Sequence, residues 1–248
     1  MSAWPAVVLA TAPPTLAGKL DASDWPRITR ELDERGTATL PALLDRDSCR
    51  AIAASYGDDA RFRARVVMAR HGFGRGEYRY FAYPLPFDLA VVRARLYAAL
   101  APLANDWNKR LGIDTRFPAT HAEFLARCHT AGQTRPTPLL LRYGAGDYNC
   151  LHRDLYGEHV FPLQLAVLLS APGADFTGGE FVVTEQRPRQ QSRVDVVPLA
   201  QGDAVVFAVS ERPASGVRGW YRVTHRHGVS RLTRGERHTL GVILHDAQ

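Results

Sequence analysis

Three side chains in the second half of the chain are of the types that bind transition metals. His152 and Asp154 are separated by one residue. Alternate residues of an extended segment point to the same side, so an imidazole and a carboxylate can meet one cation there. His227 lies on or just after a strand-like segment further along. Two imidazoles and one carboxylate form a facial triad that leaves positions open on an octahedral Fe(II) ion, whereas zinc favours a closed or nearly closed tetrahedral site. The set therefore predicts an iron site.

Two further side chains, His225 and Arg237, are candidates for the same site. His225 is an alternative to His227, because the two lie on the same face of an extended chain; otherwise His225 is a polar residue beside the ligands or in the interior. Arg237 follows His227 by ten residues. A guanidinium makes two charge-assisted hydrogen bonds to one carboxylate. Arg237 is thus a candidate to hold the distal carboxylate of an oxo-acid that chelates the metal.

The composition is that of a globular protein. The chain has 248 residues, of which 46% are hydrophobic and 23% charged. These values exclude wholesale disorder, a collagen-like repeat and a disulfide-rich mini-scaffold. The three cysteines are too few and too scattered for a disulfide framework. No apolar run reaches the roughly 18 residues of a membrane span, and no basic segment precedes the apolar start, so we expect no secretory signal and a cytoplasmic location.

Arginine dominates the basic residues. Of 31 lysines and arginines only Lys19 and Lys109 are lysine, which leaves 29 arginines and a net charge of +6. Arginine binds phosphates, carboxylates and aromatic faces, so an anionic partner such as nucleic acid is one interpretation. A GC-rich genome that encodes arginine in place of lysine is the other.

The periodicity of apolar residues divides the chain into a helical first half and a strand-rich second half. We expect an irregular arm or edge strand over residues 1–20 and an exposed loop over 71–81. Antiparallel strands behind a helical layer indicate an α+β fold with a sandwich or barrel core. The expected helices span 24–36, 45–57, 88–110 and 119–130, and the expected strands span 37–40, 61–68, 139–143, 163–169, 180–184, 204–209, 221–225 and 239–244.

The ordered motifs of the second half resemble the Fe(II)/2-oxoglutarate-dependent dioxygenase superfamily. They are Leu141-Arg142-Tyr143-Gly144, His152-Arg153-Asp154, Gly178-Gly179-Glu180-Phe181, Gln201 to Phe207, His227-Gly228-Val229 and Gly235 to Leu240. The resemblance implies a double-stranded β-helix, or jelly roll. We expect a single unit over 1–248, with mainly helical support and a substrate lid over 1–131 and the jelly-roll catalytic core over 132–248.

The resemblance also implies roles for individual residues. His152, Asp154 and His227 correspond to the iron ligands, and Gly228-Val229 favours His227 over His225. Arg237 corresponds to the partner of the 2-oxoglutarate C5 carboxylate, with Thr239 and Tyr143 as helpers. The implied cofactors are Fe(II), 2-oxoglutarate and O2. The implied reaction hydroxylates a C–H bond and releases succinate and CO2.

The substrate stays open between two classes. The interval from His227 to Arg237 resembles the prolyl-hydroxylase-like branch, and Ile243 stands where AlkB-type nucleic-acid dealkylases usually carry a second arginine. A protein prolyl or amino-acid hydroxylase is therefore one hypothesis, and a non-catalytic metal-binding sensor is a more distant one.

The arginines favour nucleic acid as the substrate. Arginines neutralise phosphates while aromatic rings stack on an extruded base. We therefore lean to oxidative dealkylation of alkylated nucleic acid, a repair reaction. The candidate contacts are Arg61, Arg63 and Arg65 on one strand face, Arg75, Tyr78, Arg79 and Tyr80 in the 71–81 segment, and the basic stretch 187–193.

Overall fold

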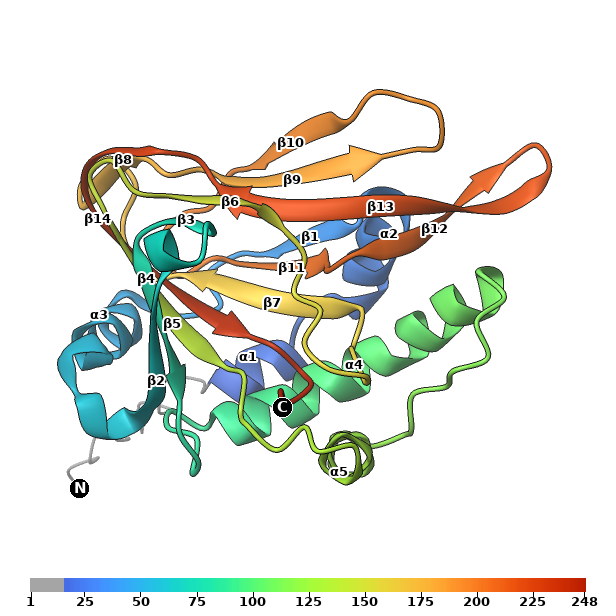
Figure 1. The fold of residues 1–248 in the computed structure, drawn as a ribbon, viewed down its shortest axis with the longest axis horizontal. Helices are drawn as coiled ribbons and strands as arrows, with labels where there is room; N and C mark the ends of the chain where they lie inside the picture. The colour runs from blue at the N-terminus through green and yellow to red at the C-terminus, as the bar shows by residue number, and fades with distance from the viewer. Residues whose placement is uncertain (1–15) are drawn as a thin grey trace, which may run out of the picture.

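The computed structural model describes residues 16–248 (Figure 1). Most of the arm or edge strand expected over 1–20 therefore lies outside the described residues. Its last part is a short helix, α1 (Leu16–Asp21). In residues 16–248 no helix has both the length and the hydropathy that crossing a membrane requires.

Two antiparallel sheets stack face to face and form the expected jelly roll (Figure 1). The first has the strand order β1 (Thr37–Leu40), β11 (Ala204–Ala208), β7 (Leu163–Leu168), β14 (Leu232–Val242), β5 (Leu139–Gly144), β4 (Glu77–Phe81) and β2 (Phe62–Val67), with β8 (Phe176–Gly178) paired to β14. The second has the order β10 (Arg193–Val197), β9 (Phe181–Gln186), β13 (Gly219–Val229), β6 (Tyr148–His152) and β3 (Gly74–Arg75), with β12 (Glu211–Gly216) paired to β13. The α+β fold class is confirmed.

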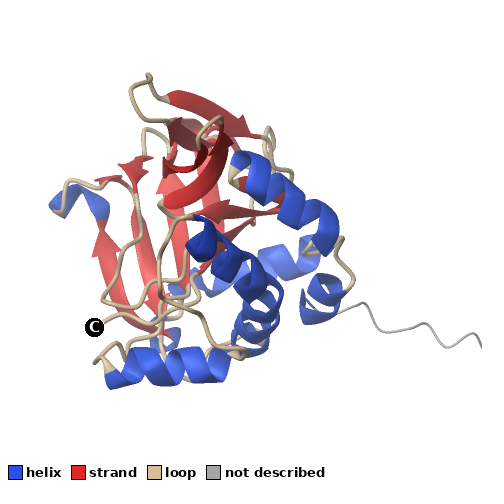
Figure 2. Cartoon of the chain, turned by 90° about the vertical axis from the view of Figure 1, so that its right-hand side faces the viewer, coloured by secondary structure: helices blue, strands red, loops and turns tan. Residues whose placement is uncertain are grey.

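Most of the helical residues gather on one side of the strands (Figure 2). The helices are α2 (Trp25–Arg35), α3 (Arg46–Ala54), α4 (Leu89–Arg110) and α5 (His121–Thr130), with single 3-10 turns at Ser55–Gly57, Asp59–Arg61 and Met68–Arg70. Capping side chains mark the N-terminal ends of α2 and α5. Asp24 accepts a hydrogen bond from the Arg27 amide at the start of α2, and Thr120 and Glu123 form a capping box on α5.

The central strand β7 shows why the helices pack where they do. Leu163, Leu165 and Val167 belong to the main core, which they share with the apolar stripe of α4. Ala166 and Leu168 belong to the smaller clusters between the two sheets. Because alternate residues of a strand face opposite sides, β7 is buried on both faces and divides the helical core from the interior of the jelly roll.

The segment 71–81 is not the exposed loop that the sequence suggested. Residues 74–75 and 77–81 form β3 and β4, and Glu77, Tyr80 and Phe81 are buried. Gly74 is a site of close approach rather than a flexible link, since a Cβ there would lie 2.4 Å from the Tyr148 carbonyl oxygen. The first half of the chain thus supplies strands to both sheets, so the expected boundary at residue 131 does not separate helical support from the jelly roll.

The arginines that the sequence placed on one face of the 61–68 segment do not share a face in the structure. A bulge between Phe62 and Ala64 interrupts the pairing of β2 with β4. Arg63 lies over the ring of Tyr80, 4.5 Å from its centroid. Arg65 instead forms an ion pair with Glu77. An extra residue in one strand turns its neighbours to opposite faces, so these two arginines do not act together.

A buried ion pair anchors the end of the chain to the helical layer. The Arg93 guanidinium lies 2.9 Å from the Asp246 carboxylate, and both side chains are at most 1% exposed. Tyr83 and His129 also hydrogen-bond to Asp246, each at 2.9 Å. Removing one partner of such a pair leaves an uncompensated buried charge. The anchor therefore fixes residues that follow β14, the strand that carries Arg237.

We predict that Asp246→Ala lowers the free energy of unfolding by about 3–5 kcal/mol, because Arg93 stays buried without its counter-ion. Urea denaturation measures the change. Asp21→Ala is the matched control, since Asp21 pairs with Arg95 at 3.6 Å with both side chains at least 51% exposed. The control should cost less than about 1 kcal/mol, and equal losses in the two variants would contradict the prediction.

Candidate metal centre

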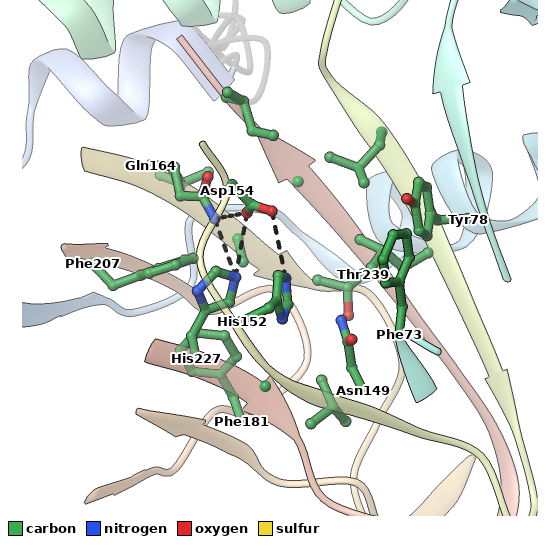
Figure 3. Close-up of a pocket in the computed structure, with 18 of the residues that line it drawn as sticks. Phe73, Tyr78, Asn149, His152, Asp154, Gln164, Phe181, Phe207, His227 and Thr239 are labelled. Carbon is green, nitrogen blue, oxygen red and sulfur yellow. Dashed lines mark hydrogen bonds and ion pairs between the residues drawn. The ribbon is translucent and has the colours of Figure 1, made fainter. Parts of the chain in front are cut away.

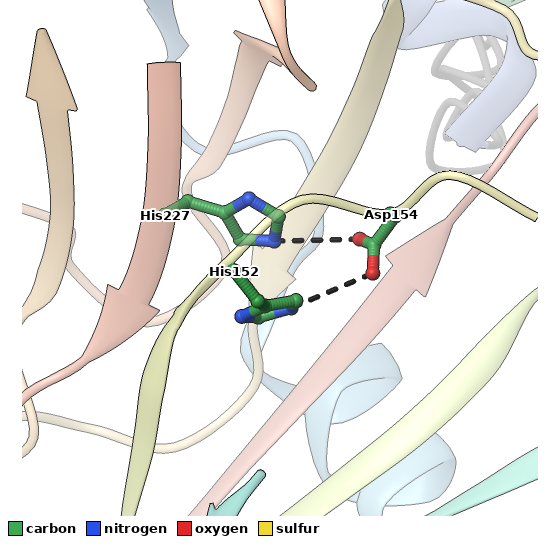
Figure 4. A group of neighbouring side chains, drawn as sticks. All are labelled: His152, Asp154 and His227. Carbon is green, nitrogen blue, oxygen red and sulfur yellow. Dashed lines mark ion pairs between the residues drawn. The ribbon is translucent and has the colours of Figure 1, made fainter. Parts of the chain in front are cut away.

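The register of two strands brings the three candidate ligands together. His152 ends β6 and lies opposite His227 of β13. Asp154 follows His152 by two residues, in the segment that leaves β6. One ligand atom from each of the three residues can be chosen so that all lie within 4.8 Å of one another (Figure 4). Their donor types and separation fit a facial set for Fe(II).

The glycine after His227 makes this register possible. A shift in the pairing of β13 with β6 occurs between His227 and Val229. A Cβ at Gly228 would lie only 2.7 Å from the Asn149 carbonyl oxygen. A larger residue would therefore push β6 away, and the His-Gly pair of the motif has a steric reason.

Burial and mutual hydrogen bonds shift the pKa values of all three candidate ligands. Burial acts to raise the pKa of Asp154, but hydrogen bonds from His152 and His227 outweigh it and hold that pKa well below its ordinary value. Burial lowers the pKa of His227. The pKa of His152 is raised, because its contacts with Asp154 outweigh the effect of burial. His152 Nδ1 also donates to the Cys150 carbonyl at 2.8 Å, which leaves Nε2 directed at Asp154.

A cavity of about 210 Å³ opens beside the three ligands (Figure 3). Most of its wall is apolar, and its polar groups are few and convergent, as in small-molecule sites. One residue of the cavity wall, Phe73, is 48% exposed to solvent. The lining includes Phe73, Tyr78, Leu139, Leu141, Tyr143, Asn149, Arg153, Tyr156, Gln164, Phe181, Phe207, Arg237, Thr239 and Ile243.

Arg237 is a buried cation without an anion. It is 2% exposed, and burial lowers its pKa to about 10. Its Nη1 donates to Thr239 Oγ1 at 2.5 Å, its Nε has no partner, and no carboxylate of residues 16–248 forms an ion pair with it. Tyr143 packs beside the guanidinium, whose carbon lies 5.8 Å from the ring centroid. The unmet donors fit a ligand carboxylate, so this arrangement matches the distal carboxylate of 2-oxoglutarate.

The other histidine, His225, is directed elsewhere. Its Nε2 accepts a hydrogen bond from Arg212 Nε at 3.1 Å, within a buried network that includes Glu185. Burial lowers the pKa of His225 to about 4. The His225 ring is therefore part of this buried hydrogen-bond network and not of the candidate ligand cluster. Arg187 and Arg193 of the basic stretch also pair with Glu185.

The four candidate substrate residues do not converge on one surface. Tyr78 lines the cavity. Tyr80 is buried against Arg63, and Arg75 is an exposed residue whose Nε lies 4.0 Å from Asp147. Arg79 pairs with Asp59 and lies over the rings of Tyr56 and Phe62. Because β4 alternates, Arg79 points away from the cavity that Tyr78 lines.

Two residues that the sequence analysis did not select touch Asp154. Gln164 Nε2 donates to Asp154 Oδ2 at 2.7 Å, and the Tyr156 hydroxyl donates to Oδ1 at 2.8 Å. The sequence could have indicated Gln164, since it is the one polar residue in the otherwise apolar segment Leu163–Leu168. Nothing in the sequence indicated Tyr156, because it lies in an irregular segment without a motif.

Comparison with known proteins identifies relatives over most of the chain. The model of the Oxygenase-NA family, described as "Oxygenase, catalysing oxidative methylation of damaged DNA", matches residues 76–247. Two uncharacterized proteins from strains of Mycobacterium tuberculosis are each 47% identical over 167 residues, which span 66% of this chain and 72% of theirs.

Solved structures share the fold at low identity. A Trichoplax adhaerens prolyl hydroxylase in complex with a hypoxia inducible factor peptide has a TM-score of 0.54 at 13% identity, covering 90% of this chain and 88% of that one. A 2OG-Fe(II) oxygenase family oxidoreductase from Burkholderia pseudomallei has a TM-score of 0.51 at 19% identity, covering 91% and 93%.

We predict opposite effects of Arg237→Met on stability and on ligand binding. Without 2-oxoglutarate the variant should melt at the wild-type temperature or above it, because it removes a buried, unpaired charge. Binding of 2-oxoglutarate should weaken by at least about thirtyfold, or about 2 kcal/mol, since the carboxylate loses its charged partner. Thermal melting with and without 2-oxoglutarate measures both. Arg234→Met, at an exposed position of the same strand, should change neither; retained 2-oxoglutarate binding in Arg237→Met would contradict the assignment.

The family match runs through the three strands that bring the histidine pair and the buried arginine to one cavity. The chain therefore belongs to the Oxygenase-NA family of oxygenases, and its jelly-roll core is similar to that of a 2OG-Fe(II) oxygenase family structure.

Proposed function

We propose that this oxygenase is an Fe(II)- and 2-oxoglutarate-dependent dioxygenase that removes alkyl groups from damaged nucleic acid by hydroxylating the carbon attached to the base. His152, Asp154 and His227 would hold Fe(II), and Arg237 with Thr239 and Tyr143 would hold 2-oxoglutarate. The observation that supports this reaction best is the shared cavity. It is lined by the three candidate ligands and by the buried guanidinium of Arg237, which has no ion-pair partner in residues 16–248. The family description, which concerns damaged DNA, supports the substrate class.

The metal with its cosubstrate would supply the activation of dioxygen. The protein holds the reactants in position, supplies charged side chains and excludes water from the site. Asp154 contributes one negative charge beside two imidazoles, so the set partly neutralises a divalent cation. Phe181 and Phe207 lie against the ring of His227, at centroid distances of 6.1 and 4.6 Å. Such walls exclude water from the reacting carbon. Arg237, which lines the same cavity, would hold the distal carboxylate of the cosubstrate.

The exposed aromatic ring of the cavity lining supports a flat substrate. Phe73 stacks on His71, with ring centroids 5.3 Å apart and an interplanar angle of 22°. The Cys150 amide donates to the Phe73 carbonyl at 2.9 Å, which holds this residue beside β6. Arg153 lines the same cavity, and Arg75 follows in β3 with a side chain that is 61% exposed. A base extruded from its stack can pack on such a ring while arginines contact its phosphates.

The enzyme assay compares two substrate classes. We expect 2-oxoglutarate turnover with oligonucleotides that carry N-methylated bases, with one formaldehyde released for each succinate. Asp154→Ala should abolish both products, because the facial set loses its carboxylate. Proline-containing peptides serve as the alternative substrate, favoured by the spacing of His227 and Arg237. Peptide mass gain of one oxygen without formaldehyde release from oligonucleotides would overturn the proposal.

A binding experiment tests the role of the exposed ring. Phe73→Ala should weaken binding to a single-stranded methylated oligonucleotide by roughly 5–150-fold, because stacking contributes about 1–3 kcal/mol per base. The wild-type affinity should also fall steeply with salt. Trp220→Ala is the matched control, since Trp220 is likewise 48% exposed but lies at the distant end of β13. Equal affinities of the Phe73 variant and the wild type would remove the stacking role.

A further inference from the structure

The carboxylate of Asp154 is held at both of its oxygen atoms. Gln164 Nε2 lies 2.7 Å from Oδ2, and the Tyr156 hydroxyl lies 2.8 Å from Oδ1. Figure 3 shows Gln164 reaching from the cavity wall toward Asp154 and His227. Gln164 Nε2 is also 3.4 Å from His227 Nε2. One amide group thus lies against two of the three candidate ligands.

The orientation of this amide follows from chemistry. An ionised carboxylate only accepts hydrogen bonds, so the NH2 group of Gln164, and not its carbonyl, must face Asp154. The carbonyl oxygen Oε1 is then left buried without a hydrogen-bond partner. The side chain is 5% exposed. An unpaired buried carbonyl is unfavourable, so packing alone does not account for glutamine at this position.

The position is well suited to hold a neighbour in place. Gln164 lies on β7, where Ala166 and Leu168 share its face and the other face packs on the helical core. The backbone beneath the amide is therefore fixed by burial on both sides. The second side-chain torsion of aspartate is intrinsically broad. Hydrogen bonds, rather than rotamer preference, must set which way the carboxylate of Asp154 faces.

We propose that Gln164 is a positioning residue that fixes the carboxylate of Asp154 for metal binding, with Tyr156 as the partner on the other oxygen. The inference rests on the proposed function, because it takes Asp154 as a metal ligand. Its effect falls on metal affinity rather than on the stability of the fold. Hydrogen-bond partners of metal ligands typically change metal affinity by about 10–100-fold when they are removed.

The test measures metal binding directly in the full chain. Fe(II) is titrated anaerobically in the presence of 2-oxoglutarate and followed by the visible charge-transfer band, and Co(II) absorption is recorded in parallel. We expect Gln164→Leu to weaken Fe(II) binding by about 10–100-fold and to alter the Co(II) spectrum. The melting temperature of the metal-free variant should equal or exceed that of the wild type. Gln164→Met, which conserves volume, replaces the leucine variant if that protein does not fold.

Two controls separate the possible outcomes. Gln201→Leu removes a half-buried glutamine whose amide donates to the Leu169 carbonyl away from the cavity, and it should leave Fe(II) affinity unchanged. Tyr156→Phe should weaken binding in the same direction as Gln164→Leu, and the double variant should show coupling. Fe(II) affinity of the Gln164 variants within about twofold of wild type would overturn the positioning role alone, since it falls far below the expected change. Failure of the wild-type chain to bind Fe(II) would instead overturn the metal centre and, with it, this inference.

Discussion

The site depends on one cross-strand pair, in which β6 and β13 place His152 opposite His227. Facing residues of neighbouring strands bring their side chains close together, so backbone hydrogen bonds deliver both imidazoles to one point. Asp154 then needs only two further residues of chain to reach them. The three side chains come from a rigid sheet and its immediate continuation, which gives the precision that a metal centre requires.

A second constraint is the burial of charge without compensation inside the protein. Arg237 lacks an ion-pair partner in residues 16–248, whereas the buried Arg93 and Arg212 have Asp246 and Glu185. The fold therefore pairs its structural arginines and leaves one unpaired in the cavity. A buried, unpaired cation is destabilising unless a ligand supplies the anion. This contrast sets Arg237 apart from the anchoring arginines of similar burial and supports its proposed role in binding a ligand anion.

The sequence predicted the jelly roll, the long helices and the clustering of His152, Asp154 and His227, because motif spacing and apolar periodicity are local signals. The exposed loop predicted over 71–81 is wrong, because Gly74 permits the close approach of β3 and β6 rather than forming a turn. The sequence also predicted that Arg63 and Arg65 share one strand face. A β-bulge turns them to opposite faces, and the pattern of residue types does not predict that bulge. Tyr156 could not be found at all, since an irregular segment brings it to Asp154 only in three dimensions.

The two faces of β7 show how stability and chemistry share one strand. Its outer face contributes Leu163, Leu165 and Val167 to the main core, which fixes the backbone. The inner face carries Gln164, a residue whose carbonyl is left without a partner and which therefore costs stability. Because the outer face is so thoroughly buried, the inner face tolerates that cost. The helical layer thus supports the candidate metal centre through the rigidity of the strand that lies between them.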